Sequence, residues 1–111
     1  MTEPTTDVIQ GTLDLLILKT LSLESMHAYA IARRVEQVSR GVFRVNPGSL
    51  LTALQRLERA GSIDGEWREG EQGRRIRVYE LTRSGRKGFA DAAAEWKRKS
   101  SAVARLLSAE A

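Results

Sequence analysis

Residues 44–61, RVNPGSLLTALQRLERAG, are typical of a capped amphipathic helix whose first turn is unusually bare. Asn46 can cap this helix and Pro47 suits its first position, but Gly48 follows directly. Glycine costs a helix about 1 kcal/mol relative to alanine. No carboxylate stands in the first turn, although the helix dipole favours one there. A slim, uncharged helix start of this kind suits the approach of an anionic group.

The remainder of this helix has two distinct faces, and it is expected to end near Ala60–Gly61. At about 100° per residue, one face is aliphatic and comprises Leu50, Ala53, Leu54 and Leu57. The opposite face comprises Gly48, Thr52, Gln55 and Arg59, flanked by Ser49 and Arg56. Burial of the aliphatic face therefore leaves small polar groups, followed by arginines, exposed for a partner.

The composition indicates one soluble globular domain. The chain has 111 residues, of which 41% are hydrophobic and 29% are charged. It has no cysteine and one histidine, so we expect no disulfide, no metal site and no cofactor. The longest strongly apolar run, residues 15–23, contains a lysine and is too short to span a bilayer. Residues 1–7 are acidic and polar, unlike a signal peptide, so we expect a cytoplasmic protein with no membrane contact.

The net charge of +4 is unevenly distributed, and fourteen of the eighteen basic residues are arginine. Residues 1–27 carry one basic and four acidic residues, whereas residues 28–63 carry six arginines against two acids. Arginine suits forked contacts with phosphates and with guanine edges. A genome that prefers arginine codons explains the same composition equally well.

The order of elements predicts a mostly helical fold with a small β-hairpin wing. Helices are expected over residues 8–23, 27–39 and 47–60, the second of them stopped by Gly41 at the C′ position. The segment VFRVN, residues 42–46, can form a one-rung strand. Two strands, SIDGEWR and RRIRVYELT, flank the glycine-containing loop EGEQG, and Thr82 can cap a last long helix. This is the order of a winged helix-turn-helix over residues 8–82, followed by a C-terminal dimerisation helix over residues 83–108.

The first and last helices carry more apolar surface than a domain of this size needs. The first has one stripe at Ile9, Leu13, Leu16, Ile17 and Leu21, and a second flank at Leu15 and Leu18. The last repeats every seven residues at Phe89, Trp96 and Val103, with Ala92, Lys99 and Leu106 between them. We predict a homodimer, the alternative being a last helix folded back on its own core. The residues assigned to the dimer contact are Ile9, Leu13, Leu16, Phe89, Trp96, Val103 and Leu106.

In a winged helix-turn-helix, the third helix enters the major groove of DNA and the hairpin touches the backbone or the minor groove. The helix residues assigned to DNA are Asn46, Gly48, Ser49, Thr52, Gln55, Arg56 and Arg59. The loop EGEQG carries two acids that would repel a phosphate, so the wing contacts are expected at Arg74, Arg75 and Arg77. Tyr29 is either a phosphate contact or a core residue, and its place on the inward stripe with Ile31, Ala32, Val35 and Val38 favours the core. His27 is expected to be a structural or capping residue.

Several motifs together resemble the PadR-type transcriptional regulators of the short kind, with a single C-terminal helix. They are GTLDLLIL (11–18), HAYAIA (27–32), NPGSL (46–50), ALQRLE (53–58) and YELTRSG (79–85). The resemblance implies a homodimeric repressor of small-molecule-response genes that pairs through its first and last helices. In some members, aromatic residues on the terminal helices sandwich flat effectors, so Trp96 is either an effector contact or a packing residue of the dimer seam.

Three departures from the family pattern concern the DNA-binding region. The family often has glycine where Ala28 stands, and it carries an aromatic residue and a proline where Leu51 and Thr52 stand. Because the last two lie on or near the groove-facing surface, the DNA preference of other members does not transfer to this chain.

Two functions of different classes follow, and neither is enzymatic. The leading hypothesis is a dimeric repressor that binds double-stranded DNA at an inverted repeat with half-sites roughly 34 Å apart. The alternative is a winged-helix module that docks an acidic protein partner. Such a dock needs a hydrophobic anchor on the outer face of helix 47–60, and Gly48, Thr52, Gln55 and Arg59 offer none. No partners for a catalytic triad can be assigned, and EGEQG lacks the lysine and spacing of a phosphate-binding loop.

Overall fold

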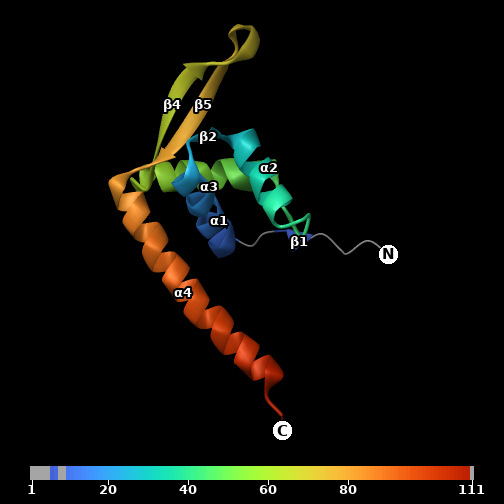
Figure 1. Ribbon diagram of the computed structural model, residues 1–111. Coiled ribbons are helices and arrows are strands. Elements are labelled where there is room, and N and C mark those ends of the chain that lie inside the picture. Colours follow the sequence, from blue (N-terminus) through green and yellow to red (C-terminus); the bar gives the residue numbers. More distant parts are fainter. Residues whose placement is uncertain (1–5, 8–9, 111) are drawn as a thin grey trace.

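The computed structural model describes residues 6–7 and 10–110, with side chains from residue 12 onward. Its elements are β1 (Thr6–Asp7), α1 (Gln10–Leu23), β2 (Met26–His27), α2 (Ala28–Val38), β3 (Phe43–Arg44), α3 (Pro47–Arg59), β4 (Ile63–Glu69), a 3₁₀ turn (Glu71–Gly73), β5 (Arg75–Leu81) and α4 (Arg83–Ser108). In Figure 1, α1, α2 and α3 form a compact body, the β4–β5 hairpin projects from it, and α4 runs away in the opposite direction. This is the predicted winged helix-turn-helix with an added C-terminal helix.

The central strand of the antiparallel sheet is β5, in the order β2-β5-β4. The hairpin register runs from Ile63 opposite Leu81 at the base to Glu69 opposite Arg75 near the tip. Strand β2 was not predicted, and it places Met26 beside Tyr79. A separate parallel pair joins β3 to β1, which confirms the short strand expected in VFRVN. The sheet therefore ties the base of the wing to the helical body.

Helix α1 lies at the centre of the core, where it contacts α2, α3, α4 and β5. Ile17 is fully buried, and Leu18, on the second apolar flank, is also buried. Leu13 is only 3% exposed and lies in the core of its own protomer, so its assignment to the dimer contact is wrong. Ile9, assigned to the same contact, lies outside the described residues. Much of the apolar surface of α1 is thus buried within one protomer, because α2, α3, α4 and β5 surround the helix.

Both ends of α2 are capped. The Ala30 N–H donates a hydrogen bond to His27 Nδ1 at 3.1 Å, which confirms His27 as a capping residue. At the other end, Arg40 has φ 55° and Gly41 has φ 78°, and the Gly41 N–H donates to the Glu36 carbonyl at 2.8 Å. This is a Schellman motif in which Gly41 occupies C″. The left-handed C′ position predicted for Gly41 belongs to Arg40, because the helix ends one residue earlier than expected.

Two residues of α2 that were predicted to face inward lie on the surface. Tyr29 is 68% exposed and Val38 is 72% exposed, whereas Ile31 and Val35 are buried. Both exposed residues belong to the end turns of this 11-residue helix, and the buried pair occupies its middle. The placement of Tyr29 in the core was therefore wrong.

Helix α3 buries the predicted face, comprising Leu50, Ala53, Leu54 and Leu57. Its cap is also as predicted, since the N–H groups of Gly48 and Ser49 donate to Asn46 Oδ1 at 2.8 and 3.1 Å. Gly61 has φ 80° and ends the helix in the left-handed conformation that favours glycine. With one face packed and both ends fixed, the position of the opposite face is well defined.

Helix α4 has 26 residues and packs against the body near its start, where it contacts α1 and β5. The Gly85 N–H donates to Thr82 Oγ1 at 3.0 Å, which confirms the predicted cap. A Cβ atom on Gly85 would overlap the Ser62 carbonyl, so the first turn of α4 packs against the turn between α3 and β4 at a distance that only glycine allows. Figure 1 shows the C-terminal half of α4 standing away from the body.

Candidate nucleic-acid interface

The outer face of α3 begins with small groups and ends with long polar ones. Gly48, Ser49 and Thr52 are exposed, as are Gln55 and Arg59 further along. The first turn carries no acidic residue, so the positive end of the helix dipole is uncompensated by a side chain. A hollow of about 450 Å³ adjoins this turn and is lined by Leu13, Asn46, Gly48, Ser49, Thr52, Ala53 and Arg56. The structure thus brings most of the predicted helix residues together around one concave surface.

Arg56 is not free on this face. Its Nη2 donates a hydrogen bond to Asp14 Oδ1 on α1, and the two side chains are 34% and 29% exposed. The guanidinium therefore lies at the rim of the hollow with its charge partly compensated. Asp14 was not identified from the sequence, since nothing in the α1 pattern distinguishes it from a solvated acid.

The opposite flank of α3 is held by a second ion pair. Arg77 Nη2, on β5, donates to Glu58 Oε2 at 2.6 Å, and the two side chains are 27% and 32% exposed. The hydrogen bond to Glu58 raises the pKa of Arg77 above its ordinary value. One of the three predicted wing arginines is thus bound to α3, while Arg74 and Arg75 are exposed.

Trp67 on β4 lies close to two of the wing arginines, and its role was missed in the sequence. The guanidinium carbons of Arg75 and Arg77 lie 5.1 and 5.3 Å from the centroid of its ring, within cation–π range. Trp67 and Arg77 are paired across the hairpin, and Trp67 remains 54% exposed. The alternation of side chains along the two strands indicates that Arg75 and Arg77 share a face. That Trp67 lies on the same face, opposite Arg77, follows only once the register of the hairpin is known.

An apolar hollow of about 660 Å³ opens between the start of α2, α3 and the wing. Its lining comprises His27, Ala28, Tyr29, Leu51, Gln55, Glu58, Trp67, Ile76, Arg77 and Tyr79. The centroid of the exposed Tyr29 ring lies 6.4 Å from the centroid of the His27 ring and 5.8 Å from the guanidinium carbon of Arg33. Tyr79 is buried, and this burial raises the pKa of its phenol. Tyr29 therefore belongs to the same side of the molecule as the outer face of α3.

The seven-residue stripe of α4 is largely exposed in the protomer. Trp96 is 51% exposed, Val103 53% and Leu106 76%. Phe89 is the exception, because it packs half-buried against the core with Lys19 Nζ 6.0 Å from its ring centroid. Exposed apolar side chains that share one side of a projecting helix are typical of an interaction surface.

A second apolar surface lies on the side of α1 and α2. Leu16 is half-buried there and lines a hollow of about 180 Å³ with Lys19, Thr20, Leu23, Arg34, Val35, Val38, Ser39 and Phe43. The exposed side chains of Leu23 and Val38 border it. Leu16 thus faces an open apolar surface, unlike Leu13.

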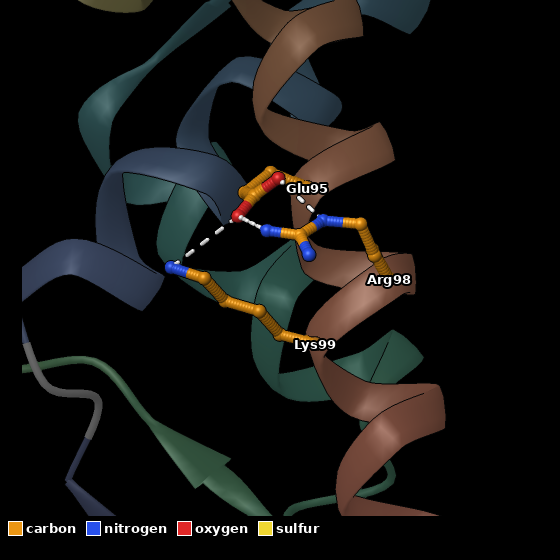
Figure 2. Close-up of polar contacts among 3 residues, drawn as sticks. All are labelled: Glu95, Arg98 and Lys99. Atoms are coloured by element: carbon orange, nitrogen blue, oxygen red, sulfur yellow. Dashed lines mark hydrogen bonds and ion pairs between the residues drawn. The ribbon is translucent and has the colours of Figure 1, made fainter.

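Charged residues form local contacts along the exposed part of α4. Arg98 donates to both carboxylate oxygens of Glu95, at 2.6 and 3.1 Å, and Lys99 Nζ lies 3.7 Å from Glu95 Oε1 (Figure 2). These contacts, foremost the hydrogen bond from Arg98, lower the pKa of Glu95, and the same bond raises the pKa of Arg98. Pairs of opposite charge one turn apart add to the stability of an exposed helix. The projecting part of α4 therefore has local support of its own.

Two other kinds of site are absent from the part of the chain that the structure describes. Within residues 6–7 and 10–110, no three histidine, aspartate or glutamate side chains cluster as metal ligands would. In the same residues, no helix combines the length and the apolar character needed to cross a membrane.

A three-helix body, a hairpin wing and an exposed polar face on the third helix define the winged helix-turn-helix class of DNA-binding proteins. The family described as "Transcriptional regulator PadR-like family" matches residues 17–91 of this chain. The chain therefore belongs to the PadR-like family of transcriptional regulators, which bind DNA and are not enzymes.

Solved structures of family members agree with this assignment. A PadR family transcription regulator from Clostridium difficile is 27% identical with a TM-score of 0.75, covering 86% of this chain and 97% of its own. A PadR-like transcription factor from Bacteroides fragilis is 27% identical with a TM-score of 0.74, covering 87% and 91%. A PadR-like regulator from Bacillus cereus, 24% identical with a TM-score of 0.78 and covering 91% and 96%, shows the fold alone. A curated relative, uncharacterised protein X of Lysinibacillus sphaericus, is 24% identical over 90 residues, 81% of this chain and 83% of that protein.

Proposed function

We propose that this regulator is a homodimeric repressor that binds an inverted-repeat operator through α3 and the wing, in the cytoplasm. The observation that carries the proposal is the outer face of α3. It is exposed, carries no acid in its first turn, and leads with Gly48, Ser49 and Thr52. A slim start of this kind allows the backbone to approach base edges and phosphates closely.

We assign the contacts by side-chain chemistry. Gln55 suits a forked contact with adenine and Arg59 one with guanine, while Thr52 suits either a hydrogen bond or a thymine methyl group. Asn46, Gly48 and Ser49 lie at the helix start, where N–H groups and the dipole favour a phosphate. Arg74 and Arg75 on the wing are assigned to the phosphate backbone, and Arg56 to a base edge at the flank of the groove. Tyr29 is assigned to the backbone on the side of the apolar hollow.

The proposal of a homodimer rests on the exposed stripe of α4 and on the apolar surface around Leu16. Pairing through the first and last helices would bury Trp96, Val103 and Leu106. A two-fold axis would then direct the two α3 helices toward half-sites roughly 34 Å apart. Trp96, on this seam, is our candidate contact for a flat aromatic effector that releases the DNA.

A second candidate is a dock for an acidic protein partner, which the apolar hollow beside α3 favours. Leu51 is 50% exposed there, near the exposed Tyr29 and Trp67 and the wing arginines. The sequence pattern indicated no hydrophobic anchor, because Leu51 lies on the flank of the outer face rather than at its centre. DNA remains the leading partner because the centre of that face is small and polar.

The test of the proposal is selection from a pool of random duplexes by the full-length protein. A repressor enriches an inverted repeat, and that site placed across a promoter lowers reporter transcription when the protein is present. Failure to enrich any sequence contradicts the proposal. A poly-glutamate competitor that displaces the protein from a fixed duplex more effectively than unlabelled duplex supports the second candidate.

The effector is tested separately with a panel of flat aromatic compounds. In a Trp67→Phe variant, Trp96 is the remaining tryptophan, so its fluorescence reports binding at the α4 seam. Quenching accompanied by release of the selected duplex supports an effector. Unchanged fluorescence and unchanged DNA affinity across the panel contradict it.

A further inference from the structure

The wing and α3 are joined by one polar contact in the middle of the hairpin. Arg77 Nη2 lies 2.6 Å from Glu58 Oε2, and both side chains are about two-thirds covered. Glu58 stands on the flank of α3 next to the outer face, and Arg77 stands on β5. The contact thus connects the two elements that a winged helix-turn-helix presents to DNA.

The space around the Arg77 guanidinium is shaped by β4. A Cβ atom on Gly65 would lie 2.5, 2.8 and 2.9 Å from Nε, Cζ and Nη2 of Arg77, closer than real side chains allow. Trp67, two residues along the same strand, lies 5.3 Å from the guanidinium carbon. A glycine therefore leaves room for the arginine, and a tryptophan stacks on it.

The charges of this pair are directed at each other. The carboxylate of Glu58 accepts the hydrogen bond from Arg77, and the same bond raises the pKa of Arg77. Standing alone beside the proposed interface, Glu58 would repel a phosphate. Arg75, two residues away on the same face of β5, is exposed and contacts only the Trp67 ring among the contacts described for the wing.

We infer that Arg77 is a positioning residue, which fixes the angle of the wing against α3 through Glu58 and does not neutralise a DNA phosphate. The inference rests on the proposed function, since the angle matters for binding only if α3 and the wing contact one duplex together. Held in this way, Arg74 and Arg75 reach the backbone while Gln55 and Arg59 face the groove. Because the wing is already fixed in the free protein, binding does not have to supply the entropy cost of ordering it.

The experiment compares Arg77→Ala, Glu58→Ala and the double variant on the selected duplex over a salt series, with Arg75→Ala as the control. Although the two single variants change the net charge in opposite directions, we expect each to weaken binding roughly fivefold. The double variant should bind no more weakly than either single one. Arg75→Ala should reduce the slope of log affinity against log salt by about 0.9, whereas Arg77→Ala should leave this slope unchanged.

The opposite pattern overturns the inference. Tighter binding by Glu58→Ala, together with a slope reduced by about 0.9 in Arg77→Ala, makes Arg77 a phosphate contact. Unchanged affinity in all three variants overturns it as well.

A second variant and a second readout do not depend on charge or on DNA. Gly65→Ala changes no charge but forces the flexible end of the Arg77 side chain to move, so it should weaken binding in the same direction as Arg77→Ala. In a Trp96→Phe background, Arg77→Ala should shift the emission of Trp67 in free protein because it removes the guanidinium beside the ring, and Glu58→Ala should shift it as well because the guanidinium loses its anchor. If the wild type shows no DNA preference but these shifts appear, the proposed function fails and the positioning contact stands. If Glu58→Ala leaves the emission of Trp67 unchanged, the positioning contact fails.

Discussion

Arg56 on α3 donates a hydrogen bond to Asp14 on α1, on the flank of α3 opposite the contact between Glu58 and Arg77. Helix α3 is therefore held by an ion pair on each side. The exposed face between the pairs begins at Gly48, where no acidic residue stands in the first turn. This arrangement presents a narrow polar surface in a fixed orientation, as reading of base edges requires.

Arg56→Ala should reduce the preference for the selected duplex over random DNA by about tenfold, since a contact with a base edge contributes about 1–3 kcal/mol of discrimination. Asp14→Ala should instead strengthen binding to random DNA, because it removes an acid and releases a guanidinium. Competition titrations with the two duplexes measure both effects.

Stability provides the control for these two variants. Each should lower the free energy of unfolding in urea by no more than about 1 kcal/mol, since the pair is about one-third exposed and solvent screens it. Equal loss of selected and random binding in Arg56→Ala would move Arg56 to the backbone contacts.

Asn46 gives a test that separates folding from binding. Asn46→Ala removes the cap of α3 and should cost about 1 kcal/mol of stability. Asn46→Asp keeps a capping oxygen and should retain the stability, but it places a negative charge where we assign a phosphate. Urea unfolding and duplex titration should therefore give opposite rankings for the two variants. An Asn46→Asp protein that binds as tightly as the wild type would exclude a phosphate at this helix start.

Gly85 and Gly88 form a matched pair on α4. A Cβ atom on Gly85 overlaps the Ser62 carbonyl, whereas one on Gly88 meets open space. Gly85→Ala should therefore cost more than about 2 kcal/mol in the free energy of unfolding, because the backbone must shift. Gly88→Ala should stabilise the protein by up to about 1 kcal/mol through helix propensity. Thermal or urea unfolding measures both, and equal effects of the two substitutions would contradict the close packing of α4 on the body.

Two variants that each place one negative charge on a different side of α4 test the dimer. Leu106→Asp introduces an acid into the apolar stripe, while Ala94→Asp introduces the same charge on the opposite, exposed face. Sedimentation velocity should show a dimer for the wild type and for Ala94→Asp, and a monomer for Leu106→Asp at micromolar concentration. A wild type that sediments as a monomer, or two variants that behave alike, would contradict the proposed pairing.

Local signals were sufficient for much of the fold. Asn46, Gly61 and Thr82 each act through neighbours within a few residues, and all three lie where the pattern predicts. Tyr29 and Val38 were misplaced because periodicity gives the side of a helix but not how far its end turns extend beyond a partner. Leu13 was misassigned for a related reason, since the number of elements around α1 is a property of the whole fold.

The exposed face of α3 could be predicted from the sequence, but the contacts that join α3 to the wing could not. The outer face of α3 follows from helical periodicity and from the burial of Leu54 and its neighbours. The contact of Arg77 with Glu58 does not follow from periodicity, because it depends on the hairpin register and on the position of the wing relative to α3. Those are long-range contacts, and a single sequence contains no direct signal for them.

The most direct test of the central claim is fluorescence anisotropy of a labelled selected duplex, with a scrambled duplex of equal length and composition, over a salt series. We predict that affinity for both falls linearly with salt on logarithmic axes, because phosphate contacts release counterions. The selected duplex should keep an advantage of about a thousandfold or more near physiological salt. Equal affinity for the two duplexes at every salt concentration would contradict the account of α3 as a helix that reads DNA sequence.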